Sequence, residues 1–576
     1  MLPGVLSIIS FVSLAFFIPI ITFLLPKKIG YAAEIISAIV ILVYLFMNFS
    51  FTEAMMLISL MALAYGNLGI ILDKDKQNRR RQLKQELIVS DYETIKQGKD
   101  MKRITVDVLI ALLVSAGAVL FLIFAPETYA LLKFIIGIFL LTTLTQLIAR
   151  AADFSYTKLY FLPQQERLVI VSAFESRDLP LRDIKEVHRE SAPDLLRLHP
   201  LFTFLSENKD YTMSFLSVLR LSFPGENIYL TPDDVEGWQE RLAGFAASNE
   251  EKREKKILPL WHPKNLKRLI WKGYFAITVK GISAYTGLLF ILIWLDVSPY
   301  IMISFVLLWW LFNLYVSDRV LVAASDAVEV TKGELYDQAK TIFKQAGIAK
   351  TRLYLIDSPI YNGLATGMNI GRGTIMLTTA TTKLSMDAVK AIVAHEAIHI
   401  KKRDVLTNQI ARMLFFGFLA AVINLFFDQL VLLSDHLVVF IIFFYILMLV
   451  FPMYLSFVAQ WMEIRADHLG AKLLESETEQ MGNGLRELGN AQDQAVGKTL
   501  KYSTNDAKPL RNKPSAARDS WFIRFLEFQF QPYPPLYWRI YCLSSSLNWR
   551  ETKKAWMAAR WKESLPDFLR KKVQVK

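Results

Sequence analysis

The chain has 576 residues, too many for one ordinary domain and enough for about three or four domains of roughly 150 residues each. Hydrophobic residues make up 53% of it and charged residues 21%, a balance that excludes disordered, collagen-like and coiled-coil chains. The net charge of +13 is typical of a membrane protein with basic cytoplasmic loops, so we expect no nucleic-acid partner. With the single cysteine Cys542, any ordered metal must be bound by histidine and carboxylate.

Nine predominantly apolar stretches are long enough to cross a bilayer, so the sequence predicts a polytopic α-helical membrane protein. They are residues 4–25, 31–50, 54–72, 104–125, 129–149, 273–295, 299–316, 413–433 and 437–459. The first lacks a basic leader and exceeds the length of a signal-peptide core, so we interpret it as a retained span. The weaker ones are 273–295, with Lys280, and 413–433, with Asp428.

The distribution of basic residues predicts the orientation in the membrane. The loop 73–103 contains the run Arg79-Arg80-Arg81, which the positive-inside bias places in the cytoplasm. We therefore expect a multi-pass protein of the cytoplasmic membrane with an external N-terminus and a cytosolic C-terminus. The polar regions predicted to face the cytosol are 150–272, 317–412 and the tail after residue 460.

Four regions follow from this pattern. They are a five-span membrane domain at 1–149, a cytosolic module at 150–250, a basic linker with two spans at 251–316, and a domain at 317–576 with the last two spans. The segment 154–246 alternates strand-like runs with turns and ends in a helix that Asp233 or Asp234 can cap. It predicts a β-rich α+β module and resembles a bacterial pleckstrin-homology-like domain. It is either a surface for a protein partner or regulator, or a spacer.

The chemistry concentrates in the segment MDAVKAIVAHEAIHI, which has helical periodicity and Ser385 as a predicted N-cap. Within it His395, Glu396 and His399 form an H-E-x-x-H motif. Positions i and i+4 place both imidazoles on one helix face, where they can share one zinc ion, with Glu396 directed toward a water at the open coordination position. The alternative is two surface histidines on an amphipathic helix.

Catalytic zinc usually has three protein ligands. The helical segment QWMEIRADHLGAKLL places Glu463 and Asp467 at i and i+4, so that Glu463 can reach the metal and Asp467 can accept the free ring N–H of a ligand histidine. His468 is the rival third ligand, but it points about 100° away from Asp467 around the helix.

These motifs together resemble the HtpX-like and CAAX prenyl endopeptidase family of integral-membrane zinc metalloproteases, over about 330–545. The resemblance implies a mainly helical, gluzincin-like metalloprotease domain with a small sheet and one zinc per chain. It implies that His395, His399 and Glu463 bind the metal, that Glu396 is the general base, and that Asp467 supports a ligand. The late element YPPLYWRI keeps Arg539 but has Tyr533 where the family has histidine, so the donor to the oxyanion is left open between them.

The residues predict hydrolysis of a peptide bond. Glu396 would take a proton from a zinc-activated water and later return it to the leaving amine. We expect an extended substrate to add to a sheet edge formed by the segment 374–380, with Asn362 fixing the loop beside it. The alternative for that segment is an ordinary core strand. The predicted substrate-binding residues are Asn362, Thr374, Ile375, Met376, Leu377, Thr378 and Thr379.

The expected partners are the lipid bilayer and protein or peptide substrates, and the resemblance implies membrane-protein quality control. A non-catalytic receptor or scaffold is the alternative, and a transporter is disfavoured because paired intramembrane charges are lacking. The stretch 333–356 predicts a helix ended by Gly347 and then a strand. The polar stretch 476–520 predicts an exposed insertion or mobile loop.

Overall fold

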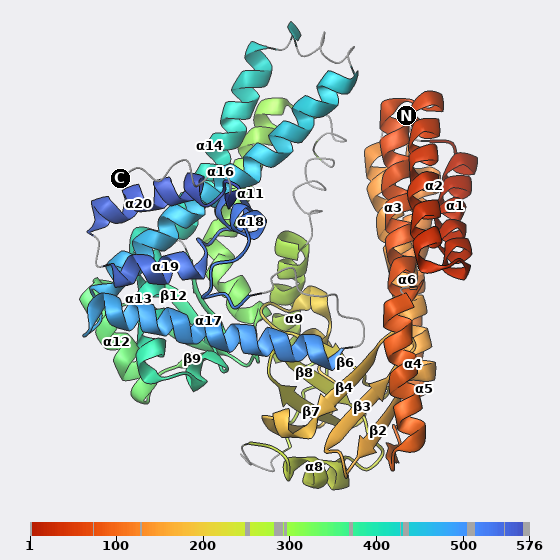
Figure 1. The fold of residues 1–576 in the computed structure, drawn as a ribbon, viewed down its shortest axis with the longest axis horizontal. Coiled ribbons are helices and arrows are strands. Elements are labelled where there is room, and N and C mark those ends of the chain that lie inside the picture. Colours follow the sequence, from red (N-terminus) through yellow and green to blue (C-terminus); the bar gives the residue numbers. More distant parts are fainter. Residues whose placement is uncertain are drawn as a thin grey trace.

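The computed structural model describes residues 3–72, 74–126, 130–247, 254–280, 292, 297–367, 373–426, 428–429, 437–503, 513–545 and 548–567. A long helical bundle, a β-rich domain and a mainly helical domain follow one another along the chain (Figure 1). The helices α14 (Asp404–Leu425) and α16 (Leu437–Ala471) and the first part of the N-terminal bundle extend to the same side of the molecule, whereas the part of the bundle with Leu83 and Leu87 lies against the β-rich domain (Figure 1).

The N-terminal bundle consists of apolar helices joined by a basic one. Its elements are α1 (Val5–Leu24), α2 (Lys27–Asn48), α3 (Phe51–Leu72), α4 (Lys74–Val89), α5 (Met101–Phe124) and α6 (Ala130–Tyr156). Helix α1 packs on α2 and α3, with Phe11, Leu45 and Leu57 in the contact. Large apolar side chains such as Ile35 and Ile39 are exposed on α2, as expected for a helix surrounded by lipid.

Within the described residues, six helices are long and apolar enough to cross a membrane: Leu6–Leu24, Lys28–Asn48, Met101–Phe124, Lys133–Tyr156, Tyr300–Ala324 and Asp404–Val422. They overlap six of the nine predicted spans. The span 54–72 corresponds to α3, whose described apolar part is the shorter Glu53–Gly66. Most of 273–295 lies outside the described residues, as do many side chains of 437–459. A multi-pass membrane protein is supported, while nine spans are not established.

The β-rich domain contains two four-stranded sheets, with strand orders β1-β2-β3-β4 and β5-β7-β8-β6. Its elements are β1 (Glu93–Ile95), β2 (Lys158–Leu162), β3 (Arg167–Val171), β4 (Ser176–Pro180), β5 (Glu186–Glu190), α7 (Leu195–Leu198), β6 (Asn208–Asp210), β7 (Val218–Phe223), β8 (Glu226–Leu230) and α8 (Val235–Ala243). Asp234 caps α8 by accepting a hydrogen bond from the amide of Gly237. The predicted β-rich module with one closing helix is therefore confirmed.

Two helices connect this domain to the second half of the chain, α9 (Pro263–Phe275) and α11 (Pro299–Ala324), and they pack side by side. The mainly helical domain then contains β9 (Val328–Val330), α12 (Glu334–Ala346), β10 (Arg352–Ile356), β11 (Gly363–Thr366), β12 (Thr374–Thr378), α13 (Met386–Lys402), α14 (Asp404–Leu425), α16 (Leu437–Ala471), α17 (Glu477–Tyr502), α18 (Trp521–Phe530), α19 (Leu536–Ser544) and α20 (Trp549–Lys562). Helix α12 ends at Gly347 in the left-handed conformation and β10 follows, as predicted.

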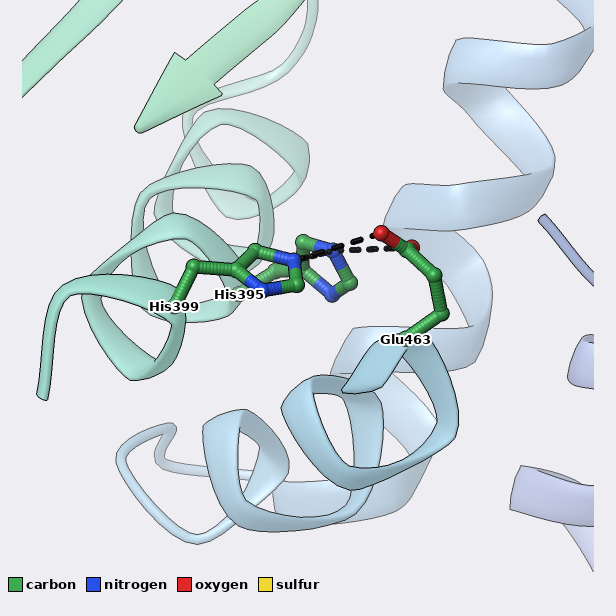
Figure 2. Close-up of side chains that lie close together, drawn as sticks. All are labelled: His395, His399 and Glu463. Atoms are coloured by element: carbon green, nitrogen blue, oxygen red, sulfur yellow. Dashed lines mark hydrogen bonds and ion pairs between the residues drawn. The ribbon is translucent and has the colours of Figure 1, made fainter. Parts of the chain in front are cut away.

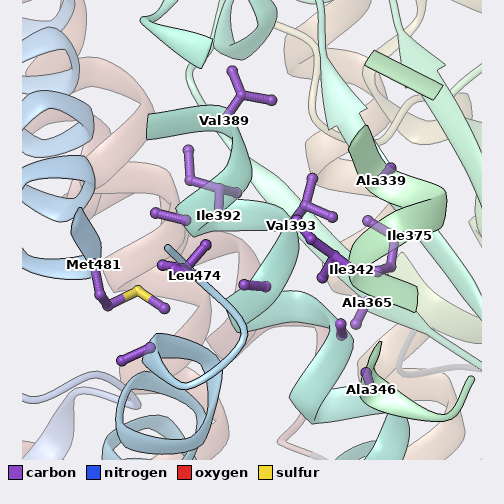
Figure 3. Close-up of a cluster of buried hydrophobic side chains, with 14 of the residues drawn as sticks. Ala339, Ile342, Ala346, Ala365, Ile375, Val389, Ile392, Val393, Leu474 and Met481 are labelled. Carbon is purple, nitrogen blue, oxygen red and sulfur yellow. The ribbon is translucent and has the colours of Figure 1, made fainter. Parts of the chain in front are cut away.

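Helix α13 lies at the centre of this domain, packed by α12, β11, α16 and α17 (Figure 3). Its first turn is capped by Ser385, whose hydroxyl accepts a hydrogen bond from the amide of Ala388, as predicted. Val389 and Val393 lie in its buried core with Met481 of α17. Because burial of each such side chain stabilises the fold by about 1.5–3 kcal/mol, this helix is held rigidly.

The sheet corrects one prediction. Its order is β11-β12-β10-β9, so β12 pairs with β11 on one side and with β10 on the other. The segment Thr374–Thr378 is therefore an interior strand, and its backbone cannot receive a substrate strand. The edge strands are β9 and β11, and β11, which begins directly after Asn362, is the antiparallel strand outside β12. The side chains of β12 are all buried.

The second correction concerns 476–520. Its first part is not a loop but the 26-residue helix α17, which packs on α13 and α19. The polar composition of this segment concealed two features. One is an apolar face with Met481 and Leu485, and the other is a set of glycines that let α17 pack close to neighbouring helices. A Cβ at Gly484 would lie 2.7 Å from the Cβ of Ala391 on α13. The helix is therefore part of the core.

Candidate metal centre

Helices α13 and α16 bring three potential metal ligands together (Figure 2). The Nε2 atoms of His395 and His399 are 3.0 Å apart. Glu463 places Oε2 3.3 Å from Nε2 of His395 and Oε1 3.4 Å from Nε2 of His399. Two imidazoles one helical turn apart thus face a carboxylate from a helix that lies 64–68 residues later in the chain.

This arrangement fits a tetrahedral metal ion. Ligand atoms at about 2.0–2.1 Å from one zinc ion are separated from each other by about 3.3 Å in tetrahedral geometry. The two Nε2 atoms are 3.0 Å apart and each lies 3.3–3.4 Å from one oxygen of Glu463, so the separations are of this size. Oε2 of Glu463 is also buried without a properly oriented hydrogen bond from any described residue. The His/His/Glu group can therefore bind a metal.

Each imidazole is oriented by a second carboxylate. Nδ1 of His395 lies 2.9 Å from Oδ1 of Asp467, and Nδ1 of His399 lies 2.8 Å from Oδ2 of Asp404. A ring N–H donated to a carboxylate fixes the tautomer and leaves Nε2 of each ring free to act as a ligand. Asp467 therefore stands where the i, i+4 spacing predicted.

Asp404 was not predicted from the sequence. It follows His399 by five residues, a spacing that no regular helix would bring to the same face. Helix α13 ends at Arg403, whose φ of 56° is left-handed and turns the chain so that Asp404 returns toward the ring. Arg465 of α16 forms an ion pair with Asp404. The run of basic residues before Asp404 indicated a helix end, but not the direction in which the chain continues.

The electrostatics of the site favour a cation. Burial disfavours a charged imidazole, yet the close contacts with the carboxylates of Asp467 and Glu463 raise the pKa of His395 to about 9. Burial opposes ionisation of Glu463 as well, but its contacts with both histidines hold its pKa well below the ordinary value. Buried carboxylates that stay ionised attract positive charge, whether a proton or a metal ion.

Glu396 and Tyr533 lie beside the three ligands. Both line one cavity of about 870 Å³ together with His395, His399 and Glu463. Glu396 is partly exposed and has no hydrogen-bond or ion-pair partner among the described residues, so its carboxylate is available to a bound water. Tyr533 is 57% exposed, and burial of its hydroxyl followed by the charges of Glu463 and Glu396 raises its pKa to about 12. It is therefore a protonated donor at neutral pH.

Arg539 is close to the ligands but already occupied. Its guanidinium donates hydrogen bonds to both oxygens of Asp467, and Nη2 lies 3.5 Å from Oε2 of Glu463. Only 8% of the residue is exposed. Its guanidinium is thus engaged in a salt bridge, whereas the sequence had left Arg539 and Tyr533 as the two candidate donors to the oxyanion.

The remaining predicted site residues separate into two groups. Asn362 lines the cavity, directly before the edge strand β11. Gly363 follows, and a Cβ there would lie 2.7 Å from Cγ2 of Ile392 and 3.6 Å from Cγ of Glu396, so the backbone of β11 runs very close to the catalytic helix. The segment 374–379 lies behind β11 and does not line the cavity. His468 contacts Trp549, away from the three ligands.

Comparison with known proteins agrees with this geometry. Residues 329–546 match the profile of Peptidase family M48, and residues 158–246 match that of the bacterial PH domain. Three curated relatives are each described as a protease HtpX homolog. The last two percentages in each parenthesis give the fraction of this chain and the fraction of the relative that the match covers. They come from Pelotomaculum thermopropionicum (36% identical over 105 residues; 18% and 37%), Persephonella marina (34% over 104; 17% and 36%) and a Sulfurihydrogenibium species (32% over 104; 17% and 35%).

The matched segment thus spans little more than a third of the length of these relatives. The family match covers the extent that the motifs had predicted, about 330–545, and the PH-domain match covers the predicted β-rich module. Residues 329–546 are therefore similar to peptidase family M48 and to the HtpX homologs, and residues 158–246, earlier in the same chain, are similar to a bacterial PH domain.

Proposed function

We propose that this protein is a membrane-embedded, zinc-dependent endopeptidase. The observation that carries the proposal is the convergence of His395, His399 and Glu463, with Glu396 unpaired beside them in the same cavity. Peptidase family M48 and the name of the HtpX homologs support a protease. Zinc is the best match among metals because a His₂Glu set with an open position is typical of catalytic zinc.

The residues of the chain divide the chemistry between them. When bound, zinc would supply a water of lowered pKa and polarise the scissile carbonyl. Glu396 accepts the proton of the attacking water and delivers it to the leaving amine. The hydroxyl of Tyr533 donates a hydrogen bond to the developing oxyanion. Asp467 and Asp404 hold the two imidazoles in the tautomer that leaves Nε2 free, and Arg539 keeps Asp467 ionised and in place.

The substrate is proposed to bind as an extended strand along β11. Gly363, Leu364 and Ala365 all line the cavity, and β11 has β12 on one side only. An unpaired strand edge can hydrogen-bond to a peptide backbone of almost any sequence, which suits an endopeptidase with broad selectivity. The missing side chain of Gly363 lets β11 itself pack close to α13, so that a peptide paired with β11 would lie near Glu396.

We place the active site on the cytosolic side of the bacterial cytoplasmic membrane, with membrane proteins or membrane-associated peptides as substrates and quality control as the role. The basic loop 73–103 and the positive-inside bias support this orientation. Helices α14 and α16, which adjoin the metal centre, are themselves apolar at the far end from it, so substrates near the bilayer have a short path to the site.

The proposal is tested with the full-length protein purified in detergent and loaded with zinc. Glu396→Ala should retain zinc, because Glu396 is not a ligand, yet lose on the order of 10² to 10⁴ in the rate of casein or membrane-protein cleavage. Glu334→Ala, at an exposed site on α12, is the matched control and should cleave normally. Undiminished cleavage by Glu396→Ala, or no zinc in the wild type, would refute the proposed mechanism and leave a non-catalytic receptor as the better account.

A further inference from the structure

A second cavity, of about 680 Å³, lies between α9, α11 and the interior strands β10 and β12 of the sheet in the mainly helical domain. It is remote from the metal centre, and no residue lines both cavities. Cations dominate its lining: Lys264, Lys267 and Arg268 from α9, Arg319 from α11 and Arg352 from β10. They face two acids, Asp318 and Asp326.

Part of this charge is used to hold the fold together. Arg268 pairs with Asp326 through Nε and Nη2, at 2.6 and 2.7 Å, and with Asp194 at 2.8 Å. The buried Lys272 contacts Asp326 at 3.0 Å as well, so this aspartate is fully occupied. These contacts anchor α9 to the end of α11 and to the PH domain.

The other cations lack such partners. Lys264 and Lys267 have no acidic partner among the residues the structure describes, and both are exposed. Arg319 stacks on Tyr315 and has no ion pair with any residue that the structure describes. Nε of Arg352 lies 4.0 Å from Oε1 of Glu329, which is the longest distance that still counts as an ion pair. Four cations therefore face the cavity with Asp318 as the remaining acid, which makes the cavity a favourable place for an anion.

The position of the cavity identifies the anion. It lies at the end of Tyr300–Ala324, a helix apolar and long enough to cross the membrane. Trp271 lines it and packs on Tyr274, and such aromatic side chains are enriched at a membrane interface. On a neighbouring face of α9, Leu266 and Ile270 are 50% and 63% exposed, which suits acyl chains better than water.

We propose that this cavity binds the headgroup of an anionic phospholipid, with its phosphate between Lys264, Lys267 and Arg319 and its acyl chains along α9 and α11. Basic pockets beside transmembrane helices are suited to such headgroups. The floor of the cavity is formed by Arg352, Tyr354 and Thr374, at the ends of β10 and β12. A bound lipid would thus tie the sheet of the M48 domain to the membrane surface.

The test measures phosphatidylglycerol bound to the full-length protein in detergent by native mass spectrometry, with phosphatidylcholine as the neutral reference. Each Lys or Arg near a phosphate contributes about fivefold in affinity. The triple variant Lys264→Gln/Lys267→Gln/Arg319→Gln should therefore bind phosphatidylglycerol on the order of a hundredfold more weakly, and its binding of phosphatidylcholine should be unchanged. The charge-matched control is Lys332→Gln/Lys344→Gln/Lys350→Gln, three exposed lysines that do not line the cavity, and it should bind like wild type.

Each of the three substitutions is also made alone, so that a folding defect of the triple variant does not hide the result, and about fivefold is expected from each. Equal retention of phosphatidylglycerol by the triple variant and its control would overturn the proposal, and an acidic protein segment would then be the better occupant. Full displacement of the lipid by equimolar inorganic phosphate would also overturn it, because the site would then be specific for a free anion.

Discussion

The guanidinium of Arg539 donates two hydrogen bonds to Asp467, from Nε to Oδ2 at 2.7 Å and from Nη2 to Oδ1 at 2.6 Å. The same Oδ1 lies 2.9 Å from Nδ1 of His395, so a residue of α19 orients a ligand on α13 through a carboxylate on α16. Burial opposes ionisation of Asp467, but the charge of Arg539 lowers its pKa. The salt bridge thus places a permanent negative charge behind His395.

Arg539→Lys should therefore weaken zinc binding by about ten- to a hundredfold, because lysine keeps the charge but loses the planar fork that matches a carboxylate. A chelator competition on the purified protein measures the affinity. Arg486→Lys, on the exposed face of α17 with Asn483 as partner, is the control and should bind zinc like wild type. Wild-type zinc affinity in Arg539→Lys would mean that the salt bridge serves only folding.

The third ligand can be tested by comparing two residues of the same helix. Glu463→Ala should lose zinc, because two imidazoles alone bind the ion weakly. His468→Ala should keep it, since that ring lies against Trp549. Metal content per chain decides between them, and the reverse result would assign the ligand to His468.

Tyr533→Phe removes one hydroxyl and little else. If this hydroxyl donates to the oxyanion, kcat should fall by about ten- to a thousandfold, with zinc content and KM almost unchanged. Because the pKa of Tyr533 is raised to about 12, the hydroxyl stays protonated and the defect should be constant between pH 6 and 9. Normal turnover by Tyr533→Phe would mean that Tyr533 lines the cavity without taking part in catalysis.

Asp357 joins the β-rich domain to the mainly helical domain, and its contribution to stability has a defined pH dependence. It accepts hydrogen bonds from Arg220 and Arg197 of the PH domain, at 2.6–2.7 Å. Burial opposes its ionisation, but the two guanidinium groups hold its pKa well below the ordinary value. A carboxylate with a depressed folded pKa contributes stability above its unfolded pKa of about 3.9 and loses it as the pH falls through the folded value.

Asp357→Asn should therefore lower Tm equally at pH 7 and pH 5, and the difference from wild type should shrink only below about pH 4. The Asp357 side chain is 43% exposed and screened by solvent, so the loss is at most about 1 kcal/mol, or roughly 2–4 °C. Glu475→Gln, which removes a surface ion pair with Lys390, is the control and should leave Tm almost unchanged. A difference that varies between pH 7 and pH 5 would contradict the assignment.

The orientation in the membrane is tested with reporter fusions to the full-length chain. A reporter after Arg81, within 154–246, or at the C-terminus should be cytosolic, and one near Thr52 or Ser434 should be external. Accessibility to a membrane-impermeant label measures each. An external C-terminus would require a different number of spans.

Local chemistry determined much of this protein. The i, i+4 spacing of His395 and His399, the same spacing of Glu463 and Asp467, and the Ser385 cap depend only on helical geometry, so they were predictable from the sequence. The apolar stretches and the strand pattern of the PH domain were predictable for the same reason, because hydrophobic periodicity reports local structure and burial.

Only the tertiary structure decided which of these elements meet. The order of the sheet made β11 the edge and buried the segment 374–378, because strand pairing joins residues whose contacts no sequence spacing encodes. The left-handed turn at Arg403 brought Asp404 to His399. The salt bridge of Arg539 spans 72 residues, and α17 became part of the core through glycines that let helices touch. Such contacts form only when the whole chain packs, and they decide which side chains meet at the candidate metal centre.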